Sequence, residues 1–136
     1  MLRRAHAAIA LTLLAACALA ACAPAAAGTG GRTVRITIHQ SAFRPSELDV
    51  RPGETIRFVI RNTDPIDHEF IVGDLGVQDA HERGTEAYHP GLPGEVTVRA
   101  GETVTTTYTF ANDDLLFGCH IPGHWAYGMR GVVIVG

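Results

Sequence analysis

Residues that could bind a soft metal ion lie at even intervals near the end of the chain, as Cys119, His124 and Met129. Four residues separate each donor from the next, and Pro122 and Gly123 between the first two predict a loop. A thiolate, an imidazole and a thioether together suit copper better than zinc, iron or magnesium. Copper centres of this kind combine two histidines, a cysteine and a weak axial methionine. We therefore expect a second histidine from elsewhere in the chain.

The best candidate for that second histidine is His68. It follows a turn-forming stretch at 62–65 and begins a short apolar segment at 68–72, which predicts a strand. A single histidine at the start of a strand is more often structural or exposed than a ligand. The loop at 119–129 changes this weighting, because it supplies every other donor of the set. We therefore predict that His68 completes the site.

The beginning of the chain has the pattern of an export signal. Arg3 and Arg4 precede an apolar, alanine-rich stretch at 7–21, which is too short to favour a permanent membrane span. The stretch ends in Leu-Ala-Ala-Cys22, which resembles a bacterial lipobox, the site at which a cysteine is lipidated and the preceding peptide removed. Cys17 fits the same pattern, and an ordinary signal peptide with an incidental cysteine is the other alternative. We predict a lipoprotein-type signal peptide at 1–21, a lipid anchor on Cys22, and no other contact with the membrane.

The remaining sequence predicts one exported domain at 33–136, joined to Cys22 by a flexible linker at 22–32. Cys119 is the only cysteine in that domain, so no internal disulfide is possible there. An unprotected thiol would be oxidised outside the cell, and metal ligation is the simplest protection. The formal net charge is −3 and no basic run is interleaved with aromatic residues, which argues against nucleic-acid binding.

Short segments with alternating apolar and polar residues predict half-buried strands, most clearly at 33–38, 55–60 and 103–110. Residues 131–135 predict a buried strand. With turn residues between them, about seven strands predict an all-β sandwich. The stretch at 73–94 has no persuasive helical periodicity, although 78–84 fits one or two helical turns, and we expect a long irregular excursion there.

The chain resembles the cupredoxins, the family of plastocyanin, pseudoazurin and azurin, over residues 33–136. The most specific part is Phe-Gly-Cys-His-Ile-Pro-Gly-His at 117–124 with Gly-Met at 128–129, supported by Leu-Asp-Val-Arg-Pro-Gly-Glu at 48–54. The resemblance implies a Greek-key β-sandwich and one type 1 copper ion. It implies that the ligands of this ion are His68, Cys119, His124 and Met129.

Two residues depart from the family pattern. Glu69 stands where plastocyanins and azurins commonly have an asparagine that ties the loops together, which changes the hydrogen bonding around the ligands. His120 follows the cysteine, as in copper nitrite reductases and multicopper oxidases, where this histidine binds a further copper ion. This chain has no His-x-His motif to complete such a site. The alternative is that His120 serves packing or hydrogen bonding.

The expected function is single-electron transfer by a monomeric blue copper protein outside the cytoplasmic membrane. Four protein ligands leave no open position, and no paired carboxylates stand beside a base, so we expect no enzymatic activity. A redox partner, such as a cytochrome, an oxidase or a reductase, is expected to dock near His124, where Trp125 and Tyr127 add apolar surface. The alternative is copper sequestration or delivery, which His81 and His89 would favour if they bind additional metal.

Overall fold

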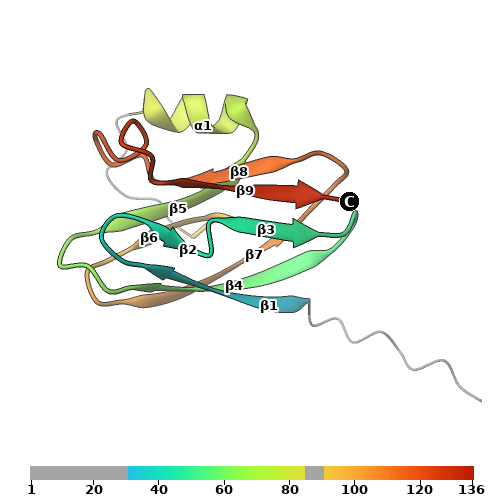
Figure 1. Cartoon of the computed structure of the whole chain (residues 1–136), viewed down its shortest axis with the longest axis horizontal. Coiled ribbons are helices and arrows are strands. Elements are labelled where there is room, and N and C mark those ends of the chain that lie inside the picture. Colours follow the sequence, from blue (N-terminus) through green and yellow to red (C-terminus); the bar gives the residue numbers. More distant parts are fainter. Residues whose placement is uncertain (1–30, 85–90) are drawn as a thin grey trace, which may run out of the picture.

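The computed structural model describes residues 31–84 and 91–136, so the predicted signal peptide, the lipidation site at Cys22, Cys17 and His89 lie outside the described residues. Two β-sheets pack face to face (Figure 1). One sheet has the order β2-β1-β4-β7 and comprises β2 (Phe43–Arg44), β1 (Arg32–Ile38), β4 (Thr55–Asn62) and β7 (Thr103–Thr109). The other has the order β3-β9-β8-β5-β6 and comprises β3 (Glu47–Val50), β9 (Arg130–Val135), β8 (Leu115–Gly118), β5 (His68–Gly73) and β6 (Glu95–Val98).

The core lies between the two sheets and confirms the predicted sandwich. Ile56, Phe58 and Ile60 of β4 are fully buried, as their alternation with polar residues predicts. Aromatic rings from both sheets meet there, with Phe58 and Phe70 at a centroid distance of 5.0 Å. The described residues form nine strands where about seven were expected, and one added strand arises because the segment around Pro45 divides into β2 and β3.

The prediction of a buried final strand is only half right. Gly131 and Val133 of β9 are buried, but Val132 and Ile134 are 38% and 42% exposed. The strand therefore has one face on the core and one in solvent, as strands at the surface of a sandwich do.

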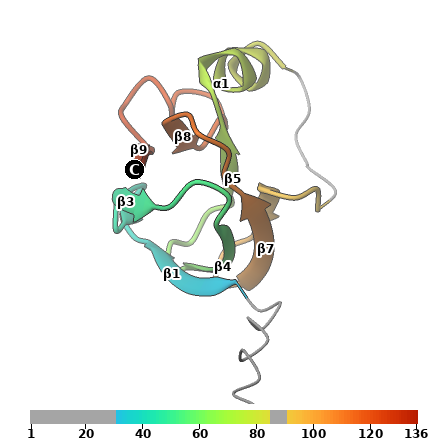
Figure 2. The same ribbon diagram turned by 90° about the vertical axis from the view of Figure 1, so that its right-hand side faces the viewer.

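The irregular excursion predicted at 73–94 is wrong in its first part, which forms the helix α1 (Leu75–Glu82). Asp74 caps the helix, because its side chain accepts a hydrogen bond from the Val77 N–H at 2.9 Å. Gln78 is the buried residue of this helix. A helix that buries a glutamine shows no apolar periodicity in its sequence, which explains why the pattern failed to predict it. Figure 2 shows α1 beside β5 and β8, on the side away from β1 and β4.

The strand pairing places the candidate ligands at one end of the sandwich. β5 and β8 are antiparallel neighbours, so the start of β5 at His68 lies near the end of β8, directly before Cys119. β8 and β9 are also antiparallel, with Gly118 opposite Arg130, so the loop 119–129 leaves and re-enters the sheet at this end. Within the part of the chain that the structure describes, no helix is long and apolar enough to span a membrane.

Candidate metal centre

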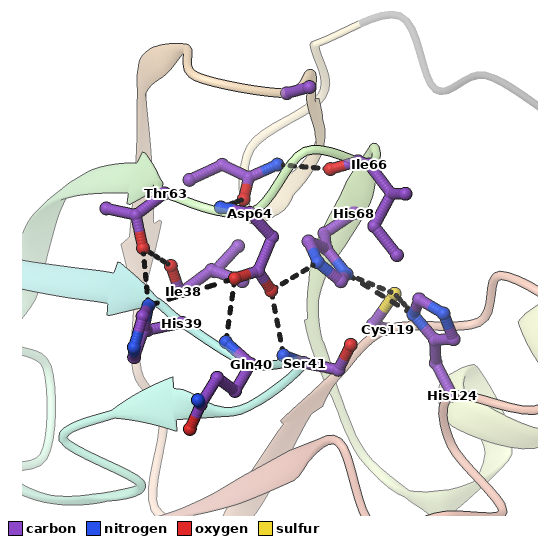
Figure 3. Close-up of polar contacts among 12 residues, drawn as sticks. Ile38, His39, Gln40, Ser41, Thr63, Asp64, Ile66, His68, Cys119 and His124 are labelled. Atoms are coloured by element: carbon purple, nitrogen blue, oxygen red, sulfur yellow. Dashed lines mark hydrogen bonds and ion pairs between the residues drawn. The ribbon is translucent and has the colours of Figure 1, made fainter.

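The ring nitrogens of two histidines and the sulfur of the cysteine converge at this end of the sandwich (Figure 3). Nδ1 of His68 lies 3.3 Å from Nδ1 of His124, and Sγ of Cys119 lies 3.3 Å from the His124 nitrogen and 3.9 Å from that of His68. All three atoms lie within 4.8 Å of one another. The structure therefore brings together three of the four residues predicted as ligands.

Each of these three side chains comes from a strand end or from a hydrogen-bonded turn. His68 is the first residue of β5 and is fully buried, and Cys119 directly follows β8 and is equally buried. His124 belongs to the loop between β8 and β9 and is partly exposed. Its backbone N–H donates to the Ile121 carbonyl at 2.9 Å.

Met129, the predicted axial ligand, ends the same loop. It is 2% exposed and belongs to the hydrophobic core. Its N–H donates to the His124 carbonyl at 2.9 Å, and its own carbonyl accepts from the Cys119 N–H at 3.2 Å. Its backbone is therefore tied to two predicted ligands, and the axial role of its sulfur stays a prediction.

The carboxylate of Asp64 lies on the side of the His68 ring away from this cluster. Its Oδ2 lies 2.9 Å from Nε2 of His68. Burial tends to raise the pKa of Asp64, but the N–H groups of Ser41 and Gln40 and the His68 ring outweigh burial and hold the pKa below its ordinary value. The ionised carboxylate only accepts, so Nε2 of His68 must donate. The lone pair of Nδ1 on the neutral ring then faces Cys119 and His124.

Burial keeps both deeply placed donors neutral when no metal is present. It lowers the pKa of His68, against the opposing effect of the hydrogen bond that His68 donates to Asp64. It raises the pKa of Cys119 to about 11, although the Glu69 and Ile121 N–H groups favour the thiolate. A metal ion that binds this sulfur must therefore displace a proton.

The chemistry of the cluster fits a copper ion. Its donors are a soft sulfur and two borderline imidazole nitrogens, and harder oxygen donors are not among the three. The lone pair of His68 Nδ1 is buried and faces two other atoms that can ligate a metal, Sγ of Cys119 and Nδ1 of His124. A bound cation would accept electron pairs from all three atoms. The Glu69 N–H, 3.3 Å from Sγ, would stabilise the thiolate of the bound state.

Comparisons with known proteins identify the family to which the chain belongs. A family model described as "Cupredoxin-like domain" matches residues 9–88, more than half of the chain. A relative from Rubrivivax gelatinosus, named "Copper-resistant cuproprotein CopI", is 37% identical over 118 residues, which cover 82% of this chain and 71% of the relative. The chain belongs to the cupredoxin family.

Two further proteins resemble this cupredoxin. A protein of Pseudomonas aeruginosa, also named "Copper-resistant cuproprotein CopI", is 28% identical, and the match covers 82% of this chain and 80% of that protein. Among solved structures, auracyanin A, described as a "blue" copper protein from Chloroflexus aurantiacus, has a TM-score of 0.61 and 25% identity, covering 79% of this chain and 100% of that chain.

Glu69 ties the two ligand segments of this cupredoxin together, in the place where the family commonly has an asparagine. The side chain is 3% exposed, and Oε2 accepts a hydrogen bond from the His120 N–H at 3.1 Å. The Glu69 backbone holds Cys119 at the same time. The carboxylate therefore connects β5 to the metal loop through a hydrogen bond. Glu69 thus ties the loops together, as the asparagine does in plastocyanins and azurins.

His120 is held by hydrogen bonds on both ring nitrogens. Nδ1 lies 3.0 Å from Glu82 Oε2, and Nε2 lies 2.7 Å from Gln78 Oε1. The ring stacks on Trp125 at a centroid distance of 4.9 Å and an angle of 28°. This geometry matches the packing and hydrogen-bonding role, and α1 supplies both partners. His81, also on α1, has its ring 5.8 Å from that of His120 but lies outside the metal cluster.

The sequence prediction missed three supporting residues. In the sequence, Asp64 has the pattern of a turn residue, Gln78 lies in a stretch without apolar periodicity, and Glu69 differs from the family only by replacing an asparagine. The one available signal was position, since Asp64 precedes His68 by four residues and Glu69 follows it directly.

Proposed function

We propose that this protein is an extracytoplasmic copper-binding cupredoxin that sequesters or delivers copper as part of copper resistance. The observation that carries the proposal is the convergence of His68, Cys119 and His124 within 4.8 Å. Relatives that share this fold are named copper-resistant cuproproteins, and two of them match over most of their own length. Bound copper would supply a Cu(II)/Cu(I) couple at this site.

The protein's own residues would hold one type 1 copper ion. His68 and His124 would each give a neutral Nδ1, Cys119 a thiolate, and Met129 a weak axial sulfur. The sequence features at Cys22 support placement outside the cytoplasmic membrane on a lipid anchor. A monomer is proposed.

Electron transfer is the second candidate function, and the exposure of the metal loop favours it. His124 is partly exposed, and its loop neighbour Tyr127 is 94% exposed. A redox partner could approach the site there through a small and weak contact. Enzymatic turnover is not proposed, because the ring nitrogens of His120 are both hydrogen-bonded to α1 and offer no free donor for a second copper.

Copper loading of the wild type and of Cys119→Ala tests the proposal. We expect one copper per chain, an intense thiolate-to-copper absorption band and narrow EPR hyperfine splitting, all lost in Cys119→Ala. A copper spectrum that Cys119→Ala leaves unchanged would refute the type 1 site.

A growth experiment separates the two functions. Cells lacking the gene should lose tolerance to added copper and recover it with the wild-type gene but not with Cys119→Ala. Normal tolerance together with rapid electron exchange between the copper protein and a cytochrome would instead establish the carrier function.

A further inference from the structure

Asp64 is held by a turn with an unusual backbone conformation. Gln40 and Ser41 have φ values of 53° and 52°, so two successive non-glycine residues adopt the left-handed conformation. This conformation costs on the order of 1–2 kcal/mol per residue. It directs both N–H groups at one carboxylate, since Gln40 N lies 2.7 Å from Oδ1 and Ser41 N lies 2.8 Å from Oδ2 of Asp64. Backbone strain of this kind is concentrated at functional sites.

The backbone of Asp64 is fixed from the other side as well. Its N–H donates to Oδ1 of Asn62 at 2.9 Å. Asn62 is fully buried and its amide nitrogen donates to the carbonyls of Ile66 and Val98. Thr63 donates through its hydroxyl to the Ile38 carbonyl at 2.7 Å. The carboxylate therefore has a defined position before any metal binds (Figure 3).

The remaining hydrogen bond of this carboxylate goes to His68. Oδ2 lies 2.9 Å from Nε2, on the side of the ring opposite the nitrogen that faces Cys119. A carboxylate in this position fixes the ring orientation and makes the other nitrogen a stronger donor. It also places a negative charge one imidazole away from the metal. The attraction between two charges grows with their product, so this charge stabilises Cu(II) more than Cu(I).

We propose that Asp64 is a positioning residue of the metal centre, which fixes His68 with Nδ1 toward the copper and biases the site toward Cu(II). The inference deepens the proposed function and rests on copper binding by this site. A site biased in this way binds Cu(II) tightly and has a lowered reduction potential.

The main experiment compares Asp64→Asn with Asp67→Asn in the full protein. Both variants remove one negative charge from the same loop, but Asp67 is exposed and its side chain accepts from the Ala100 N–H. In Asp64→Asn we expect Cu(II) affinity to fall about tenfold with little change for Cu(I). A tenfold ratio corresponds to a rise in potential of about 59 mV for a one-electron couple. Chelator competition and voltammetry measure the two quantities.

Asp67→Asn should shift the potential by much less. Equal shifts in the two variants would overturn the inference, because they would show a general effect of charge. A potential unchanged in Asp64→Asn would overturn it as well.

NMR of the wild-type apoprotein tests the positioning role without copper and without a variant that must fold. ¹⁵N shifts of His68 should show a proton on Nε2 and none on Nδ1. A proton on Nδ1 would overturn the inference. Failure of the wild type to bind copper would refute the proposed function, while the NMR result would still decide how Asp64 holds the ring.

Discussion

His68 and His124 present the same ring nitrogen to Cys119 from supports of opposite character. His68 is fully buried at the start of a strand, with a carboxylate behind its ring. His124 is partly exposed and belongs to a loop that the sheet fixes only at its two ends. One half of the site is therefore part of the sandwich itself, whereas the other half is in contact with solvent.

The exposed half has its own support, which comes from outside the sandwich. Trp125, next to His124 in the chain, stacks on His120, and α1 holds His120 through Gln78 and Glu82. Arg130 also contacts Trp125, with its guanidinium over the indole ring at 5.3 Å from the ring centroid. Side-chain packing against α1 therefore supports the loop in addition to its own backbone hydrogen bonds, while the buried carboxylate of Asp64 supports the His68 ring.

Replacement of either histidine should cause the greatest loss of copper affinity, and rescue by imidazole should distinguish the two. His68→Gly and His124→Gly should each lower copper affinity by more than about 100-fold, beyond the 10–100-fold typical of residues that only support a ligand. Free imidazole should restore binding in His124→Gly, because the opening lies at the surface, and should not do so in His68→Gly. Copper titrations with and without imidazole measure this. Equal rescue of both variants would remove the distinction between the two halves.

The stability of the apoprotein should depend on pH in two limbs. The pKa of His68 in the folded state is lowered from 6.5. The stabilising contribution of the buried neutral ring to the unfolding free energy is therefore complete above pH 6.5 and is lost as the pH falls through the lowered pKa. The folded pKa of Cys119 is raised from 9.0 to about 11, so its contribution is present below pH 9.0 and is lost as the pH rises through 11. Two pKa units correspond to roughly 3 kcal/mol.

Denaturant unfolding of the apoprotein across pH measures both limbs. Cys119→Ala should abolish the loss of stability at alkaline pH. It should keep the loss at acid pH, which is caused by His68. Persistence of the full alkaline limb in Cys119→Ala would contradict the assignment.

A substitution under the metal loop should destabilise the half that carries His124. In Gly118→Ala the new Cβ would lie 2.4 Å from Cζ3 of Trp125, closer than real contacts allow. Crowding of this kind costs about 1–3 kcal/mol of unfolding free energy. Thermal or denaturant unfolding measures the change. Gly91→Ala is the control, since an added Cβ there meets nothing within 4 Å. Equal stability of the two variants would show that Trp125 moves aside freely.

The smallest effect should come from Arg130→Met. The substitution removes the cation over Trp125 and leaves an apolar side chain, so unfolding free energy should fall by about 0.5–1 kcal/mol. Arg44→Met, at another exposed arginine on a strand, should change stability less. The same loss in both variants would mean that the guanidinium does not steady the loop.

The sequence was sufficient to predict those parts of the site that depend on donor type and strand pattern. Cys119 and His124 are recognisable by chemistry and spacing, and His68 by its place at the start of an apolar strand, while the axial role of Met129 stays a prediction. The inward face of β4 followed from simple alternation. These features are local, so the sequence pattern carries them.

The supports of the site could not be predicted, because they depend on contacts between distant segments. Asp64 is held by residues 23 and 24 positions earlier, through a left-handed turn that contains no glycine to signal it. Gln78 is polar and buried, so the buried face of α1 lacks the apolar periodicity by which a helix is predicted. In both cases a polar residue is placed by tertiary hydrogen bonds.

The pairing of Gly118 with Arg130 bears on how this molecule can change over evolutionary time. The metal loop leaves and re-enters the sheet at adjacent points, so insertions between Cys119 and Met129 need not disturb any strand. Doubling the length of a flexible loop raises the free-energy cost of closing it by only about 0.6 kcal/mol, through lost chain entropy. Descendants of this chain can therefore acquire new loop lengths, and with them new metal environments, on an unaltered sandwich.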